Sequence, residues 1–74
     1  MNEPSLIGKR LKKYRKRAQM TQHQLAEATG ISQSLIGTVE SGYRHGFSVR
    51  NLNKLADALG VTLDQLARPK GEKG

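Results

Sequence analysis

One face of a helix predicted over residues 32–41 carries short polar side chains and a glycine. Drawn at about 100° per residue, that face spans an arc of roughly 140° and is formed by Gln33, Ser34, Gly37, Thr38 and Ser41. Amides and hydroxyls both donate and accept hydrogen bonds, and no long charged side chain on this face would hold a flat partner away. The major groove of B-DNA, about 12 Å wide, presents hydrogen-bonding edges and admits a helix, so this face could lie against it.

Two short amphipathic segments between residues 21 and 42 each have their own start and stop signals. Thr21 and Ser32 can accept a hydrogen bond from an unpaired N–H of the first helical turn, and Thr21 with Gln24 has the spacing of a capping box. Gly30 and Gly42 follow the two segments, where a chain leaving a helix takes a positive φ. The pattern predicts a helix, a tight turn and a second helix.

This stretch resembles the helix-turn-helix motif of the Cro and lambda-repressor type of regulator. The matching residues open the first helix, form the helix crossing and the turn, or occupy buried positions: Gln22, Ala26, Gly30, Leu25, Ile31, Ile36 and Val39. With Ser41-Gly42 and the downstream LADALGVTLDQL, the likeness covers about residues 6–66. It implies an all-α, compact five-helix, lambda-repressor-like domain that binds double-stranded DNA as a transcriptional regulator, a repressor in our expectation. The motif is expected over residues 21–42, with the recognition helix over residues 32–41.

The resemblance also implies roles for single residues. Gln33 stands where lambda-type repressors have a glutamine that recognises adenine, and Gln22 where a glutamine bonds both to that residue and to a phosphate. An amide matches the N6 and N7 groups of adenine. Further base contacts are expected from residues on or beside the same face: Ser34, Gly37, Thr38 and Leu35. Leu35 could touch a thymine methyl or be partly buried in the core. Phosphate contacts are expected from Gln22, Tyr43, Arg44, Arg50, Arg10 and Lys9.

Arg15 lies at the edge of the apolar side of the first helix, and a half-buried guanidinium needs a partner. The resemblance implies an ion pair with Glu40, which would join the first helix to the end of the recognition helix. The alternative is that Arg15 extends along the surface into solvent.

Positive charge is concentrated near the N-terminus. The chain has 13 Lys and Arg against six Asp and Glu, a formal charge of +7, and seven of these cations lie between Lys9 and Arg17. Such a run usually forms a solvated helix face. Here Lys9 with Lys13 and Lys12 with Lys16 repel each other, and the segment has no acidic residue to relieve them. A polyanionic partner would remove that penalty.

Three further helices are predicted around the motif. The first starts near Ser5. Another runs from Ser48 to Gly60, with Leu52, Leu55, Ala56 and Leu59 on one face, and a short last helix starts from the capping-box pair Thr62 and Gln65. Phe47 is expected to fill the core rather than stack on a base. We expect one DNA-binding domain over residues 1–68 and a disordered tail over residues 69–74.

Composition argues against other classes of protein. The chain has no Cys, and His23 and His45 are isolated, so no metal or cofactor is expected. Scattered carboxylates and the lack of a phosphate loop argue against an enzyme. No apolar run approaches the roughly 20 residues of a membrane span, so we expect no membrane and a cytoplasmic protein, associated with the nucleoid when bound to DNA.

A single small domain covers few base pairs, so we expect a homodimer on a pseudo-palindromic operator with half-sites about 34 Å apart. Dimer contacts are predicted at Leu63, Gln65 and Leu66. An antitoxin or another regulator that uses the same fold to bind a regulatory protein partner is the alternative. RNA binding is disfavoured because the chain has only two Tyr and one Phe. Docking on anionic lipid is disfavoured because the core needs the apolar side of the first helix.

Overall fold

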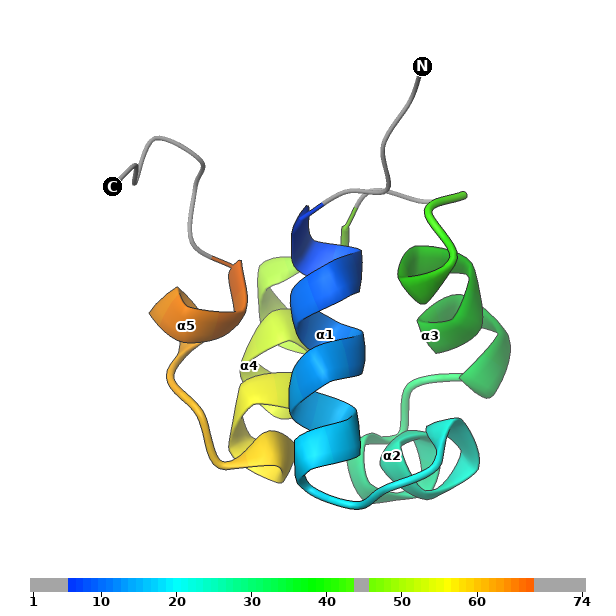
Figure 1. Cartoon of the computed structure of the whole chain (residues 1–74), viewed down its shortest axis with the longest axis horizontal. Coiled ribbons are helices and arrows are strands. Elements are labelled where there is room, and N and C mark those ends of the chain that lie inside the picture. Colours follow the sequence, from blue (N-terminus) through cyan, green and yellow to red (C-terminus); the bar gives the residue numbers. More distant parts are fainter. Residues whose placement is uncertain (1–5, 44–45, 68–74) are drawn as a thin grey trace.

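The computed structural model of the chain describes residues 6–43 and 46–67, and these residues form helices and no strand. The helices are α1 (Leu6–Arg17), α2 (Gln22–Thr29), α3 (Gln33–Glu40), α4 (Val49–Leu59) and α5 (Leu63–Ala67). In Figure 1, α1 stands in the middle, α3 lies to one side, α5 to the other, and α2 crosses below α3. The predicted all-α, five-helix architecture is confirmed.

Some sequence predictions fall outside the described residues. These are the start of the first helix near Ser5, the phosphate contact at Arg44, and the tail over residues 69–74. The division into a domain of residues 1–68 and a tail therefore stays a prediction.

The helices start where side chains satisfy the free N–H groups of the first turn. The Thr21 hydroxyl accepts from the N–H of Gln24 at 3.0 Å, while the Gln24 side chain accepts from the N–H of Thr21 at 2.8 Å. Thr62 and Gln65 form the same reciprocal pair before α5. Single serine caps precede α3 and α4, at Ser32 and Ser48. The predicted caps are confirmed.

Three helices end in the Schellman arrangement, in which a residue with positive φ follows the last turn. Gly42 after α3 has a φ of 93°, and Gly60 after α4 has a φ of 72°. At the end of α1 the same position is occupied by Gln19, with a φ of 60°. The N–H of Met20 there donates to the carbonyl of Arg15 at 3.1 Å, which closes the motif. A residue with a Cβ thus holds a conformation that favours glycine.

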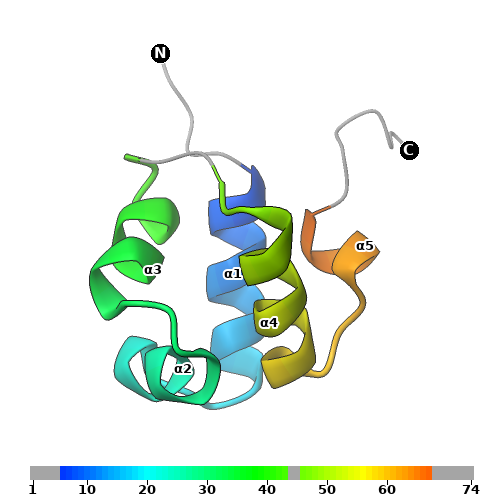
Figure 2. The ribbon, with the colours of Figure 1, turned by 180° about the vertical axis from the view of Figure 1, so that it is seen from behind.

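The core lies between the helices. Its buried members are Leu11, Leu25, Ile31, Ile36, Leu55, Ala56, Leu59 and Leu66. Helix α1 packs on α3 and α5, α2 packs on α3 and α4, and α4 packs on α5. From behind, α4 has α5 on one side and the α2–α3 pair on the other (Figure 2). Phe47 is half-buried against this core, as predicted.

The structure corrects one predicted dimer contact. Leu66 has an exposed fraction of 0 % and belongs to the core, so it is not available to a second chain. The short helix alone does not indicate which of its leucines turns inward, because that depends on how α5 docks on α1 and α4. Leu63 has an exposed fraction of 36 %, and Gln65 is also exposed.

Helix α1 approaches α3 closely at Gly8. A Cβ atom at this position would overlap the carbonyl oxygen of Val39 and lie 3.2 Å from its carbonyl carbon. Gly8 therefore lets the two backbones touch at the end of α3. This contact joins residues far apart in the chain, so no local sequence signal predicts it.

Candidate nucleic-acid interface

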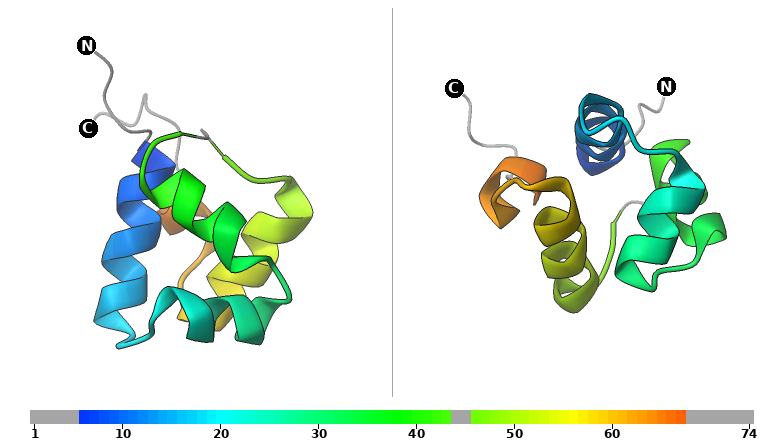
Figure 3. Two further views of the ribbon diagram at one scale, coloured as in Figure 1. Left: turned by 90° about the vertical axis from the view of Figure 1, so that its right-hand side faces the viewer. Right: turned by 90° about the horizontal axis from the view of Figure 1, so that it is seen from below.

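The turn between α2 and α3 is closed by side-chain and backbone bonds. Gly30 has a φ of 80° and donates its N–H to the carbonyl of Ala26 at 2.8 Å. The buried hydroxyl of Thr29 donates to the carbonyl of Leu25 at 2.8 Å and accepts from the N–H of Ile31 at 3.1 Å. In the left view of Figure 3, α3 runs diagonally upward from this turn, above α2 and between α1 and α4. The turn fixes the direction in which α3 leaves α2.

Helix α3 presents two chemically different faces. Ile36 and Val39 have exposed fractions of 0 %, so they anchor one face in the protein. The other face is open, with Gln33 and Ser34 exposed and Thr38 half-buried. A shallow surface hollow, here called the α3 hollow, lies along this open face and is lined by Gln22, Gln33, Ser34, Gly37, Thr38, Ser41 and Tyr43. The predicted base-contacting face is therefore at the surface.

Two hydroxyls of this face already use their protons inside the helix. Thr38 Oγ1 donates to the carbonyl of Leu35 at 3.0 Å, and the Ser41 hydroxyl donates to the carbonyl of Thr38 at 3.2 Å. What these hydroxyls offer outward is therefore mainly acceptor lone pairs, which suit the amino groups of adenine and cytosine. Leu35 is half-buried and packs against the core, which supports partial burial for this residue.

A buried ion pair supports the C-terminal end of α3. Arg15 Nε donates to Glu40 Oε2 at 2.7 Å and Nη2 donates to Oε1 at 3.0 Å, while Nη1 donates to the carbonyl of Met20 at 2.8 Å. The exposed fractions of the two side chains are 9 % and 3 %. The hydrogen bond that Arg15 donates to Glu40 raises the pKa of Arg15, desolvation by burial opposes this, and the negative charge of Glu40 adds to the increase. The predicted pair is confirmed, and it ties α1 to α3.

Gln22, a predicted phosphate contact, is hydrogen-bonded to the ion pair of Arg15 and Glu40. Its Nε2 donates to Glu40 Oε1 at 3.1 Å, and its Oε1 lies 3.4 Å from where a Cβ at Gly37 would stand. A Cβ at Gly37 would therefore be in van der Waals contact with the Gln22 amide, which lies against α3 at this residue. No local sequence signal predicts the contact between Gln22 and Gly37, because it depends on how α2 crosses α3.

The other predicted phosphate contacts that fall among the described residues lie at or near the surface. Tyr43 has an exposed fraction of 83 % and lines the α3 hollow, and Arg50 is exposed in the first turn of α4. On α1, Lys9 is exposed and Arg10 is half-buried. The outer face of α1 continues with further exposed cations, namely Lys12, Lys13, Lys16 and Arg17.

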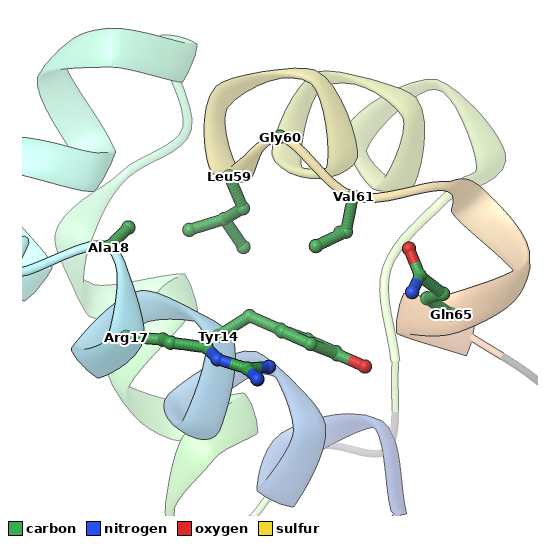
Figure 4. Close-up of a pocket in the computed structure, with 7 residues that line it drawn as sticks. All are labelled: Tyr14, Arg17, Ala18, Leu59, Gly60, Val61 and Gln65. Carbon is green, nitrogen blue, oxygen red and sulfur yellow. The ribbon is translucent and has the colours of Figure 1, made fainter.

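A second hollow lies on the other side of the molecule, between α1 and the turn from α4 to α5 (Figure 4). The guanidinium of Arg17 lies along the Tyr14 ring, 5.9 Å from its centroid, and Gln65 faces them from α5. The Gln65 side chain is already bonded to Thr62. Among the residues that the structure describes, no group of three or more His, Cys, Asp or Glu could hold a metal ion. No helix in that part of the chain is long and apolar enough to cross a membrane.

These features define a helix-turn-helix domain. A capped helix is followed by a glycine turn and by a second helix that has one buried face and one open polar face. The family model described as helix-turn-helix matches residues 11–66, and the chain belongs to this family. It is a helix-turn-helix transcriptional regulator, a class of DNA-binding proteins and not of enzymes. The resemblance to Cro and lambda-repressor type regulators is confirmed.

Two relatives illustrate the similarity. YazB of Bacillus subtilis, an uncharacterised HTH-type transcriptional regulator, is 37 % identical over 68 residues, which are 92 % of this chain and 97 % of YazB. SinR of Bacillus subtilis, an HTH-type transcriptional regulator, is 31 % identical over 67 residues, which are 90 % of this chain but only 60 % of SinR.

Solved structures agree with these sequence matches. SinR, the master regulator of biofilm formation, in complex with DNA superposes with a TM-score of 0.80 at 31 % identity, covering 82 % of this chain and 97 % of that one. SinR in complex with SinI gives a TM-score of 0.82 at 30 % identity, covering 93 % of this chain and 67 % of that one. The restriction-modification controller protein C.AhdI of Aeromonas hydrophila gives a TM-score of 0.76 at 36 % identity, covering 82 % of this chain and 91 % of that one.

Proposed function

We propose that this regulator places α3 in the major groove of double-stranded DNA and selects its site through the open face of that helix. The observation that carries the proposal is the chemical division of α3, whose apolar side closes the core while its outer side presents short polar groups. The structure of the similar protein SinR in complex with DNA supports DNA as the partner.

Gln33 is the principal base contact in this proposal. Its amide pairs with N6 and N7 of adenine, an interaction worth about 1–3 kcal/mol of discrimination. Thr38 and Ser34 add hydrogen bonds to amino groups. Gly37 allows close approach, and the exposed edge of Leu35 meets a thymine methyl.

Phosphate contacts supply most of the affinity. They come from Gln22, Tyr43, Arg44 and Arg50 and, on α1, from Lys9 and Arg10. Each neutralised phosphate releases counterions, so a chain with a net charge of +7 binds DNA with strong salt dependence.

Two copies bind a pseudo-palindromic operator, with recognition helices about 34 Å apart, one helical turn of DNA. Leu63 and Gln65 on α5 form the dimer contact, which is supported by their exposure on the surface. The DNA-binding unit spans residues 1–68. A dimer seated on an operator near a promoter represses transcription by occupying the site, on chromosomal DNA in the cytoplasm.

A regulatory protein partner is the second part of the proposal. It is supported by the structure of the similar protein SinR in complex with SinI. Such a partner would control how much of the regulator is available for DNA.

Selection of bound sites from random duplex DNA tests the DNA-binding proposal. We expect one enriched sequence with two-fold related halves, and a binding constant for the winning duplex that falls steeply with salt. Gln33→Ala should lose discrimination at one position of each half-site while binding random duplex DNA as the unmodified protein does. Equal losses on selected and random DNA would contradict the role of Gln33, and no enrichment would contradict sequence-specific binding.

A further inference from the structure

Glu40 connects the buried ion pair to the α3 hollow. Its carboxylate accepts from Arg15 through both oxygens, and Oε1 accepts a further bond from Gln22 Nε2 at 3.1 Å. With only 3 % of the Glu40 side chain exposed, solvent does not compete strongly for these bonds. The ion pair that holds α1 to α3 therefore also holds the amide of Gln22.

The charge of Glu40 decides which end of that amide faces inward. A carboxylate can only accept hydrogen bonds, so Gln22 must turn its nitrogen toward Glu40. The amide oxygen is then directed away, and of the Gln22 side-chain atoms Oε1 lies nearest to where a Cβ at Gly37 would stand, at 3.4 Å, with both residues lining the α3 hollow. Glu40 thus places an acceptor in the hollow that Gln33 also lines.

The same logic extends from Gln22 to Gln33. An amide oxygen can only accept, so Gln22 Oε1 would hold Gln33 through one N–H of its amide. The remaining edge of Gln33 then presents its oxygen and its second N–H side by side. That edge matches adenine, which offers a donor at N6 and an acceptor at N7, whereas guanine offers two acceptors, O6 and N7.

We propose that Glu40 is a specificity-determining positioning residue, which fixes the orientation of the Gln22 and Gln33 amides and so makes the domain prefer adenine over guanine. The inference rests on the proposed function and deepens it. Glu40 itself touches no DNA in this scheme and acts through a hydrogen-bond chain from Glu40 to Gln22 to Gln33.

The test replaces Glu40 by its amide and measures base preference. In Glu40→Gln the new side chain can donate to Gln22, so the Gln22 amide can turn and the orientation of Gln33 is no longer fixed. The probes are two duplexes, the one selected from random DNA and the same duplex with guanine in place of adenine at the position identified by Gln33→Ala. Binding is measured well below the melting temperature of each variant. We expect the adenine-to-guanine affinity ratio to fall on the order of tenfold.

Arg15→Lys is the matched control, because it weakens the ion pair while leaving a cation beside Glu40 and the bond from Gln22 intact. It should lower stability and keep the adenine preference. Gln22→Met, at a partly exposed position, removes the amide without disturbing the ion pair and keeps the test informative should Glu40→Gln fold poorly. It should lose the preference to the same extent, and the double variant should lose no more than either single one.

Each contrary result would overturn a different part of the proposal. An unchanged preference in Glu40→Gln, or an equal loss in Arg15→Lys, overturns the positioning role while leaving DNA binding in place. Retention of the preference in Gln22→Met, or the lack of any position sensitive to Gln33→Ala, overturns the hydrogen-bond chain. Failure of the unmodified protein to distinguish any duplex from random DNA overturns the proposed function itself.

Discussion

Gly8 of α1 lies directly against the carbonyl group of Val39 in α3, with no room between them for even a methyl group. The overlap would be with backbone atoms, which cannot rotate away as the end of a long side chain can. Any side chain at residue 8 must therefore separate α1 from α3, and α3 carries the proposed base contacts.

Gly8→Ala should therefore destabilise the domain by about 1–3 kcal/mol, the usual range for overpacking, even though alanine favours helix formation over glycine. Thermal unfolding followed by circular dichroism measures the change. Gly46→Ala is the control, because a Cβ at Gly46 would have no neighbour within 4 Å. A Gly8 variant as stable as the Gly46 variant would contradict the close contact.

Glu40→Ala should lower stability by about 3 kcal/mol, because it leaves the buried guanidinium of Arg15 without its partner. For a domain of this size the melting temperature should fall by more than about 10 °C. Since the pKa of Arg15 is raised in the folded state, its guanidinium stays charged below its ordinary pKa, and its deprotonation weakens the pair only as the pH rises through the raised pKa.

Glu27→Ala provides the comparison for the ion pair. Glu27 lies 3.3 Å from His23, but both side chains are mostly exposed, at 70 % and 66 %. Its removal should change stability by less than about 0.5 kcal/mol. If the Glu27 and Glu40 variants had the same melting temperature, the ion pair would not stabilise α3 as we describe.

Gln19→Gly should stabilise the domain. Gln19 has a φ of 60° at the end of α1. The equivalent positions after α3 and α4 are occupied by glycines, Gly42 and Gly60. A left-handed conformation costs a residue with a Cβ about 1–2 kcal/mol, and part of this is offset by the greater freedom of glycine in the unfolded chain. We expect a net gain of about 0.5–1 kcal/mol from denaturant unfolding. Gln19→Ala, which keeps the Cβ, should bring no such gain.

Arg50→Ala should weaken binding to all duplexes alike and reduce the slope of log affinity against log salt by about 1, as expected for the loss of one phosphate contact. Lys54→Ala removes the same charge elsewhere on α4, beside Ala28 and Asp57 and outside the α3 hollow. It should leave the slope nearly unchanged. Identical slopes for both variants would argue that net charge alone matters and that Arg50 makes no direct contact.

Leu63→Lys should weaken self-association, since it places a charge on each side of the proposed α5 contact. Sedimentation equilibrium should show the unmodified protein forming dimers at lower concentration than the variant. Because Leu63 has 36 % of its surface exposed, the fold should tolerate the change. A variant that dimerises normally would exclude Leu63 from the interface.

Thr21, Ser32 and Gly30 show which parts of the fold a sequence discloses. Their effects depend on neighbours within a few residues, so caps and turn were predictable from local chemistry. The pair of Arg15 with Glu40, 25 residues apart, was predictable only through the family resemblance. The polar face of α3 was predictable because helical periodicity places its members together.

Gly8, Gln19 and Leu66 mark the limits of such prediction. The need for glycine at residue 8 arises from the crossing of α1 and α3, and the burial of Leu66 arises from how α5 docks. Gln19 takes a left-handed conformation that its own residue type does not favour. The bond from Gln22 to Glu40 likewise depends on how two helices cross, and no short-range signal would have found it.

The two faces of α3 have a consequence for how such a regulator can change. Ser34, Thr38 and Gln33 contribute little to the core, so substitutions there can alter the preferred operator without endangering the fold. A library randomised at these three positions should yield mostly folded proteins with diverse targets. Glu40 cannot be varied in the same way, because its carboxylate stabilises the fold and, in our proposal, also determines the preferred base.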